Sequence, residues 1–500
     1  MRIFLLTLAL LAGCSGGGGG GSSQPPPPTL LPGQVSSTSP WNASCGNPAG
    51  AGTLYLNAEV EPHVEVDPRD PNHLVGAWQQ DRWNNGSARG IVTAASFDGG
   101  ATWTIGQPAF SVCAGGPDQR GTDPWVAITR DGTVLVIALT TTGGTFEVGS
   151  THAVQVARST DGGRTWLPPV TVLRETTPFF SDKETMTADS QDARFVYAVW
   201  DRLSEGHGAL TMFARSTDGG VTWEPARSIR GFGTDGQSIG NLIRVLPDGT
   251  LVNVYMFLRG EEDSATEARV EVIRSTDKGA TWSPAIVVSD FRGLGAHAPN
   301  GTAVRDGSII PQMAVAPNGN LYVVWQDSRF TGVRDAIAFS RSTDGGLTWS
   351  TPARVNSNPQ VTAFTPQVHV RADGVIGVTF YDFRSETGTG TNTDYWLARS
   401  ADGGNSWSET RVAATFTLAN APLVSGAYFL GDYMGLTSAG TAFLPFYART
   451  TGASVTDIFL TRIDSALSAQ KSAATPDPDL ATGRAAALAN AAAARRARLR

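Results

Sequence analysis

One eight-residue pattern occurs six times in this chain and constrains its fold more than any other feature. The first copy runs from Ser96 to Trp103 as Ser-Phe-Asp-Gly-Gly-Ala-Thr-Trp. The aspartates of the six copies lie 57 to 67 residues apart and are Asp98, Asp161, Asp218, Asp277, Asp344 and Asp402. Repetition at this period predicts a single repeat architecture, although 500 residues would suggest about three domains on length alone.

Each copy follows a short apolar or alternating run, which predicts a strand that ends in a tight turn. The aspartate and the Ser or Thr side chains can bond to backbone groups of the turn, and glycine supplies the positive φ. The pattern resembles the Asp box, which occurs in sialidases, in some xyloglucan-cleaving endoglucanases and in several non-enzymatic propellers. This resemblance implies an all-β propeller in which the six aspartates are structural turn residues.

A second repeated pattern occurs seven times, whereas the first occurs six times. Turns between two β-like runs occur seven times, at residues 70–72, 131–132, 191–192, 248–249, 318–319, 373–374 and 439–440. Seven such hairpins favour a propeller of seven four-stranded blades, and six blades with an accessory strand pair are the alternative. The last unit lacks an Asp box, so the run 53–57 is expected to supply its outer strand and close the ring.

The amino terminus has the features of an export signal. Arg2 precedes an apolar run, and Leu11-Ala12-Gly13-Cys14 resembles the lipobox of bacterial lipoproteins, which implies lipidation of Cys14. The expected divisions are a signal peptide (1–13), a lipid anchor with a Gly- and Pro-rich tether (14–50), the propeller (51–465) and an Ala/Arg-rich tail (466–500). The tail is expected to be disordered or weakly helical. These features predict a membrane-anchored lipoprotein of the bacterial cell envelope, at the outer membrane or cell surface.

Composition excludes several functions. A net charge of −7 gives no basic face for nucleic acid. The six histidines show no zinc spacing, so neither a metal nor a cofactor is predicted, and a monomer is expected. Cys45 and Cys113 remain after Cys14, and an exported protein can join them, but the sequence leaves this disulfide open.

The candidate chemistry lies on the propeller face opposite the Asp-box turns. The loops after several second strands carry an aspartate followed by an arginine, which gives Arg82, Arg202, Arg329 and Arg384. Two interpretations compete. Each arginine pairs with its own aspartate to close a loop, or the arginines converge and bind an anionic group through their planar guanidinium forks.

The second interpretation corresponds to the site of sialidases, in which three arginines bind the substrate carboxylate. A tyrosine paired with a glutamate is the nucleophile there, and an aspartate is the acid/base. The resemblance implies Arg82, Arg329 and Arg384 as the clamp and Tyr433 as the nucleophile. Its partner would be Glu184 or Glu61, and Asp123 would be the acid.

This chain departs from sialidases in two respects. Sialidases have six blades, and their Arg-Ile-Pro motif has no counterpart here. The prediction is a sialidase-like glycoside hydrolase that acts on extracellular glycans. The alternatives are a non-catalytic surface propeller that binds glycan or protein, through aromatics such as Trp83, Phe330 and Phe383, and an envelope assembly factor.

Overall fold

The computed structural model describes residues 33–42, 44–46, 52–144, 147–204, 208–261, 264–464, 472–473, 475–476 and 484–499. The predicted signal peptide and Cys14 lie outside the described residues. No helix among the described residues is both long and apolar enough to cross a membrane.

The strands form successive antiparallel groups, in which each strand pairs with the next one in the chain. Group 1 contains β2 (Val60–Asp67), β3 (Asp70–Trp83), β4 (Ala88–Ser96) and β5 (Thr104–Gly106). Group 2 contains β6 (Arg120–Ile128), β7 (Val134–Thr142), β8 (Thr151–Ser159) and β9 (Val170–Thr176). Group 3 contains β10 (Phe179–Ala188), β11 (Val196–Ser204), β12 (Leu210–Ser216) and β13 (Arg227–Gly231). Group 4 contains β14 (Gly236–Val245), β15 (Leu251–Glu261), β16 (Ser264–Ser275) and β17 (Ile286–Asp290).

The later groups continue this order. Group 5 contains β19 (Gln312–Val315), β20 (Leu321–Asp327), β21 (Ala336–Ser342) and β22 (Ala353–Arg354). Group 6 contains β23 (Ala363–Val370), β24 (Ile376–Asp382), β25 (Asn392–Ser400) and β26 (Ser406–Arg411). Group 7 contains β30 (Gly435–Ala439), β31 (Ala442–Gly452) and β32 (Val455–Leu460).

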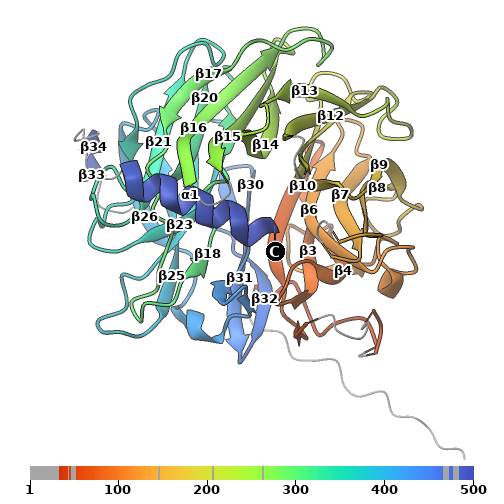
Figure 1. Cartoon of the computed structure of the whole chain (residues 1–500), viewed down its shortest axis with the longest axis horizontal. Coiled ribbons are helices and arrows are strands. Elements are labelled where there is room, and N and C mark those ends of the chain that lie inside the picture. Colours follow the sequence, from red (N-terminus) through yellow and green to blue (C-terminus); the bar gives the residue numbers. More distant parts are fainter. Residues whose placement is uncertain are drawn as a thin grey trace, which may run out of the picture.

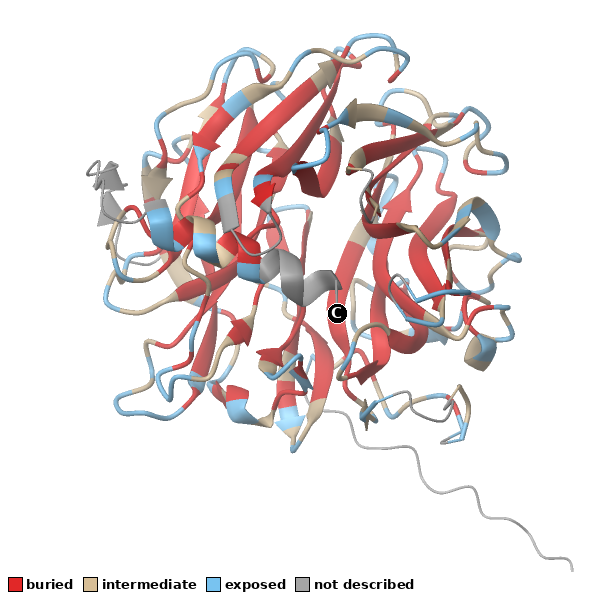
Figure 2. Ribbon diagram, viewed as in Figure 1, coloured by how far each residue is buried: buried red, intermediate tan, exposed pale blue. Residues whose placement is uncertain are grey.

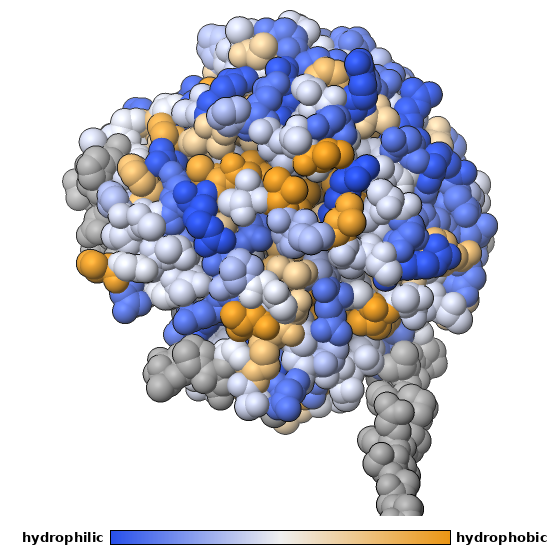
Figure 3. Space-filling view, turned by 90° about the vertical axis from the view of Figure 1, so that its right-hand side faces the viewer, coloured by the Kyte–Doolittle hydropathy of each residue, from blue (hydrophilic) through white to orange (hydrophobic). Residues whose placement is uncertain are grey.

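The groups follow one another around a common centre, which is the arrangement of a β-propeller (Figure 1). Their first strands contact one another in a closed cycle, from β2 through β6, β10, β14, β19, β23 and β30 back to β2. The strands near the centre are largely buried, and the exposed residues concentrate in the turns (Figure 2). On the side shown in Figure 3, apolar residues form small patches between polar ones.

Short elements connect and cover the groups. A small sheet joins β18 (Val304–Arg305), β28 (Leu423–Val424) and β29 (Ala427–Phe429). The remaining short elements are β1 (Leu54–Tyr55), η1 (Val112–Ala114), β27 (Phe416–Thr417), η2 (Leu418–Asn420), β33 (Ser472–Ala473) and β34 (Thr475–Pro476). Cys45 and Cys113 form a disulfide, so the pairing that the sequence left open is present.

The Asp boxes have the hydrogen bonds expected of turn residues. In the first, Asp98 Oδ1 accepts the backbone N–H of Thr102 at 2.9 Å, and Thr102 Oγ1 donates to Oδ2 at 2.6 Å. Ser96 Oγ donates to Asp98 and accepts the N–H of Gly100, both at 2.8 Å. These hydrogen bonds lower the pKa of Asp98 to about 2. The other five copies repeat the contacts between the serine, the aspartate and the following Thr or Ser.

The outer edge of group 7 differs in part from the expected run 53–57. Residues 33–36 form one half of this edge, because Val35 N–H donates to Ile458 O and Leu460 N–H donates to Gly33 O, both at 2.8 Å. Residues 57–59 form the other half, because Thr456 N–H donates to Asn57 O at 3.2 Å and Glu59 N–H donates to Thr456 O at 3.0 Å, so the expected run contributes its last residue. Val35 is buried there, whereas β1 pairs with β3. Residues 33–36, which lie inside the expected tether, therefore pack against the last group. In the tail, residues 484–499 form the helix α1 (Arg484–Leu499), which is one of the two alternatives that the sequence left open.

Candidate functional site at the centre of the propeller

The first strands carry a repeated irregularity where they approach the centre. Each of β2, β6, β10, β14 and β23 contains a register shift at which a residue has positive φ, and β2 has a second shift between Val66 and Asp67. These residues are Glu61 (φ 53°), Asp123 (φ 53°), Lys183 (φ 52°), Gly240 (φ 71°) and Thr365 (φ 49°). Positive φ is unfavourable for residues other than glycine and concentrates at functional sites. The bulges therefore mark the central positions of the strands as the candidate site.

Lys183 joins three carboxylates that come from three different groups. Its Nζ lies 3.0 Å from Glu61 Oε1 and 2.9 Å from Asp432 Oδ2, and it also contacts Asp123 Oδ1. All four residues are at most 4 % exposed. Burial of so many charges is unfavourable unless they are paired and hydrogen-bonded, and this arrangement supplies both.

Glu61 and Asp123 share a side-chain hydrogen bond, and their pKa values shift in opposite directions. Burial raises the pKa of Glu61 to about 8, against the attraction of Lys183. Burial opposes ionisation of Asp123 too, but Lys183 and the hydrogen bond from Glu61 outweigh it and lower the pKa of Asp123. At neutral pH the pair therefore holds one proton on Glu61 and one negative charge on Asp123.

Two arginines complete the central cluster, which we define as Glu61, Asp123, Lys183, Asp432, Arg82 and Arg305. Arg305 NH2 lies 3.1 Å from Asp432 Oδ2. Arg82 NH1 donates to Gln79 Oε1 at 2.6 Å, and its buried Nε has no hydrogen-bond partner among the described residues. Both guanidinium groups lie 4.9 Å from the centre of the Phe429 ring. Burial and the repulsion from Arg305 lower the pKa of Arg82 to about 10.

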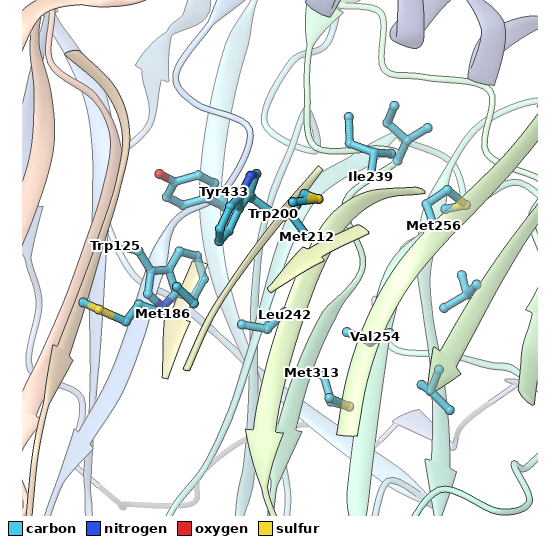
Figure 4. Packing of buried hydrophobic residues seen from close by; sticks show 14 of the residues in the cluster. Trp125, Met186, Trp200, Met212, Ile239, Leu242, Val254, Met256, Met313 and Tyr433 are labelled. Carbon is cyan, nitrogen blue, oxygen red and sulfur yellow. The ribbon is translucent and has the colours of Figure 1, made fainter. Parts of the chain in front are cut away.

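Tyr433 and Glu184 lie beside the central cluster. A cavity of about 10 Å³ is lined by both residues, by Lys183 and by Trp125, among others. The Tyr433 hydroxyl donates to Pro124 O at 2.9 Å, and its ring packs edge-on against Trp125 with centroids 5.3 Å apart (Figure 4). Neither carboxylate oxygen of Glu184 has a hydrogen-bond partner in another described residue. Burial, followed by nearby carboxylates, raises the pKa of both Tyr433 and Glu184.

The predicted site residues therefore separate into two sets. The structure brings Arg82, Asp123, Glu184 and Tyr433 together around the centre. Arg329 and Arg384 instead pair with Asp327 at 2.8 Å and Asp382 at 2.6 Å, the aspartates two residues before them. Arg202 Nε donates to Glu175 of the preceding group at 3.0 Å. For Arg329 and Arg384 the geometry agrees with the interpretation in which each arginine pairs with its own aspartate to close a loop.

Three residues of the central cluster were not among the predicted catalytic or binding residues. Two of them, Lys183 and Asp432, directly precede the predicted residues Glu184 and Tyr433 in the chain. The third, Arg305, has no such neighbour. Arg305 lies in β18, which belongs to no repeated unit, so no periodic signal marks it. The aromatics proposed for the binding alternative are not exposed. Trp83 is 1 % and Phe383 is 2 % exposed, and Phe330 is partly buried against a core cluster.

A second cavity, of about 350 Å³, lies along the first strands and is lined by His63, Glu65, Arg244 and His369, among others. Burial raises the pKa of Glu65 to about 7, and Arg244 offsets this in part. In the described part of the chain, no three His, Cys, Asp or Glu side chains form a group that could hold a metal ion.

The sequence is similar to known repeat proteins over part of its length. A profile of the BNR repeat-like domain matches residues 72–310, which agrees with the predicted repeat. The xyloglucanase Xgh74A of Acetivibrio thermocellus is 32 % identical over 148 residues, which cover 27 % of this chain and 15 % of that protein. The chain thus spans about 15 % of the length of the curated relatives it matches.

Solved structures with a similar shape have low sequence identity. A protein of unknown function from Dyadobacter fermentans is 15 % identical with a TM-score of 0.45, and the match covers 65 % of this chain and 90 % of that one. The Hadza microbial sialidase Hz136 is 17 % identical with a TM-score of 0.45, covering 79 % and 75 %. The α-L-arabinanase of Penicillium chrysogenum is 13 % identical with a TM-score of 0.43, covering 69 % and 93 %.

Proposed function

We propose that this protein is a seven-bladed propeller and a glycoside hydrolase of the sialidase-like type, with the central cluster as its active site. The closed cycle of first strands supports the seven blades. The observation that carries the hydrolase proposal is the Glu61–Asp123 pair. Two coupled carboxyl groups with opposite pKa shifts, held on strained backbone at the centre of a propeller, have the properties of an acid/base unit.

The protonation states support an anionic substrate. At pH 7 the cations are Lys183, Arg82 and Arg305, and the ionised carboxylates are Asp123 and Asp432, since Glu61 holds its proton. Within the central cluster three positive charges therefore stand against two negative ones, and Asp182, outside the cluster, also attracts Arg305. The two arginines and Lys183 supply donors for a sugar carboxylate, as in a sialoside.

The proposed chemistry assigns one role to the Glu61–Asp123 pair and another to Tyr433 with Glu184. In most glycosidases the two carboxyl groups stand about 5 Å or more apart, so the hydrogen-bonded Glu61–Asp123 pair acts as one group. Glu61 donates its proton to the leaving glycosidic oxygen, and Lys183, which contacts both carboxyl groups of the pair, stabilises the negative charge that Glu61 then carries. Tyr433 attacks the anomeric carbon and transfers its proton to the ionised form of Glu184, a role that requires the hydroxyl to leave Pro124 O. Water then cleaves the bond between the sugar and Tyr433, Glu61 takes a proton from that water, and the tyrosine recovers its proton from Glu184.

The test is turnover of a fluorogenic sialoside by the full chain, next to Glu61→Gln and Asp123→Asn. We expect each substitution to lower kcat by about 10²–10⁴-fold, because acid/base catalysis contributes that much. Asp464→Asn is the control, since the Asp464 side chain is exposed at the surface and forms a surface ion pair with Arg462. Absence of turnover by the folded native chain on sialosides and on other fluorogenic glycosides would refute the hydrolase.

A non-catalytic binding propeller is the second candidate, and one observation favours it. Lys183 and its three carboxylates are almost completely buried, and the adjoining cavity holds about 10 Å³, which is the size of one water molecule. A structural role of the central cluster would explain this closure. In that case Glu61→Gln would change the stability of the fold and leave glycan binding intact.

We further propose that Cys14 anchors the protein to the bacterial envelope by lipidation. The lipobox-like sequence before Cys14 supports this proposal. Cells that express the protein should incorporate labelled palmitate into it, and Cys14→Ser should abolish the labelling. Persistent labelling of Cys14→Ser would contradict the anchor.

A further inference from the structure

The first strands share a second set of equivalent positions, four residues after the bulged residue with positive φ. In β2, β6, β10, β14 and β23 these positions hold Glu65, Ala127, Thr187, Arg244 and His369. All five residues line the cavity of about 350 Å³. None of the described residues that line this cavity belongs to the central cluster. The cavity is therefore formed by one repeated position of the strands and lies apart from the candidate active site.

The cavity has the size and the access of a binding site for a small molecule. Small-molecule sites in proteins have volumes from about 300 Å³ upward, and this cavity lies in that range. Ala127 and Ala314 contribute only a methyl group each to its lining. Thr187 Oγ1 donates to Ile243 O of the neighbouring strand at 2.8 Å, which fixes this side chain at the wall. The cavity is open to solvent, because Ser190 at its edge is exposed.

Four titratable side chains line the cavity within the described part of the chain, and they are His63, Glu65, Arg244 and His369. Burial, followed by the repulsion from Arg244, lowers the pKa of His63 and lowers that of His369 to about 4, so both imidazoles are neutral at neutral pH. Burial raises the pKa of Glu65 to about 7. An arginine keeps its charge in proteins. Below pH 7 the guanidinium of Arg244 is therefore the charged group among these four.

The guanidinium of Arg244 is held by backbone carbonyls. Its Nε donates to Met313 O at 2.9 Å, and its Nη1 donates to Ile243 O at 3.4 Å. Carbonyl groups orient a cation but do not neutralise its charge, and a planar guanidinium binds a carboxylate through two parallel hydrogen bonds. Apolar residues that include Met186, Val315 and Leu436 also line the cavity. The lining therefore suits a molecule with one carboxylate and a compact apolar body.

We propose that this cavity is a second binding site, which takes a small organic monocarboxylate with its carboxylate on Arg244 and its apolar body against the aliphatic lining. Glu65 is protonated when the ligand is bound, because an ionised Glu65 would repel the carboxylate and compete with it for Arg244. Binding at this site does not depend on the proposed hydrolase, since the cavity and the central cluster share no residue.

The experiment titrates the full chain with benzoate by isothermal calorimetry at pH 6 and pH 8. Benzamide, which has the same shape and no charge, is the matched control ligand. We expect saturable binding of benzoate at pH 6 and at least about tenfold weaker binding of benzamide, because hydrogen bonds to a charged group are the stronger ones. The affinity for benzoate should fall about tenfold from pH 6 to pH 8, since Glu65 loses its proton with a pKa of about 7.

Two variants assign the binding to this cavity. Arg244→Gln should raise the Kd for benzoate at least about tenfold, whereas Arg462→Gln, at an exposed arginine, should leave it unchanged. Glu65→Gln should bind as the native chain does at pH 6 and keep that affinity at pH 8, a result that loss of folding cannot produce.

The proposal is overturned if benzoate does not bind saturably or binds no better than benzamide. It is also overturned if folded Arg244→Gln keeps the native Kd, or if Glu65→Gln shows the same fall with pH as the native chain. Since no glycoside is used, benzoate binding by a protein that hydrolyses no glycoside would support the second site and leave only the proposed function refuted.

Discussion

At the scale of single residues, the cavity of about 350 Å³ contains a carboxyl group whose ionisation opposes folding. Glu65 lines the cavity of about 350 Å³, and Arg244 is the charged group that acts on its carboxyl. Burial raises the pKa of Glu65 from its usual 4.5 to about 7, against the weaker influence of Arg244. A raised folded-state pKa means that Glu65 contributes stability below about pH 4.5 and loses this contribution as the pH rises through 7.

Glu65→Gln should therefore gain stability over the native chain as the pH rises. Between pH 4.5 and 8 the difference in the free energy of unfolding should shift in favour of the variant by about 2–3 kcal/mol, since each pKa unit corresponds to about 1.4 kcal/mol. Urea unfolding at both pH values measures this difference. Glu386→Gln is the contrasting variant, because backbone hydrogen bonds lower the pKa of Glu386 and its contribution is lost as the pH falls. A pH-independent difference for Glu65→Gln would contradict the assigned burial.

At the scale of elements, the Asp box is a turn that stabilises its own hairpin. Asp218 accepts hydrogen bonds from Ser216 Oγ at 2.8 Å, Val221 N at 3.1 Å and Thr222 N at 2.9 Å. Asp218→Ala removes these acceptors and should lower the free energy of unfolding by about 1–2 kcal/mol. Thermal unfolding measures the loss, and Asp464→Ala, at a surface ion pair, should change stability by less than about 0.5 kcal/mol. A loss of activity in Asp218→Ala without a loss of stability would assign the box a role outside the turn.

The elements also show what sequence could and could not predict. The Asp boxes were predictable because every contact of Asp98 lies within four residues of it. The sequence predicted that Asp123, Glu184 and Tyr433 lie close together because each is near the entry to the first strand of its repeat unit. The role of Arg82 differs from that of Arg329 although both follow an aspartate. Asp81 pairs with Arg89 on the next strand, β4, whereas Arg82 interacts with the carboxylates of the central cluster, and the Asp-Arg pattern alone does not reveal this difference.

At the scale of the whole molecule, the ring depends on contacts between its two ends. Residues 33–36 lie beside β32, and Ser36 Oγ accepts the N–H of Ile458 at 2.8 Å. Such closure leaves the last group with a paired outer edge, and it couples the stability of the first and last groups. The sequence alone pointed to 53–57 because that run directly precedes the first repeat unit. Position 35 has the deeper burial, however, since Val35 is 2 % and Leu56 is 43 % exposed.

This difference gives a matched test of ring closure. Val35→Asp places a charge against the buried edge of β32 and should lower the free energy of unfolding by at least about 2 kcal/mol. Leu56→Asp, in the segment that the sequence favoured, should cost less than about 0.5 kcal/mol because its side chain faces solvent. Urea unfolding of the two variants gives both values. If Leu56→Asp proved the more destabilising, the outer edge of the last group would have to be assigned to 53–57. If Val35→Asp is the more destabilising, residues 33–36 form part of the outer edge of the last group and contribute to closing the ring.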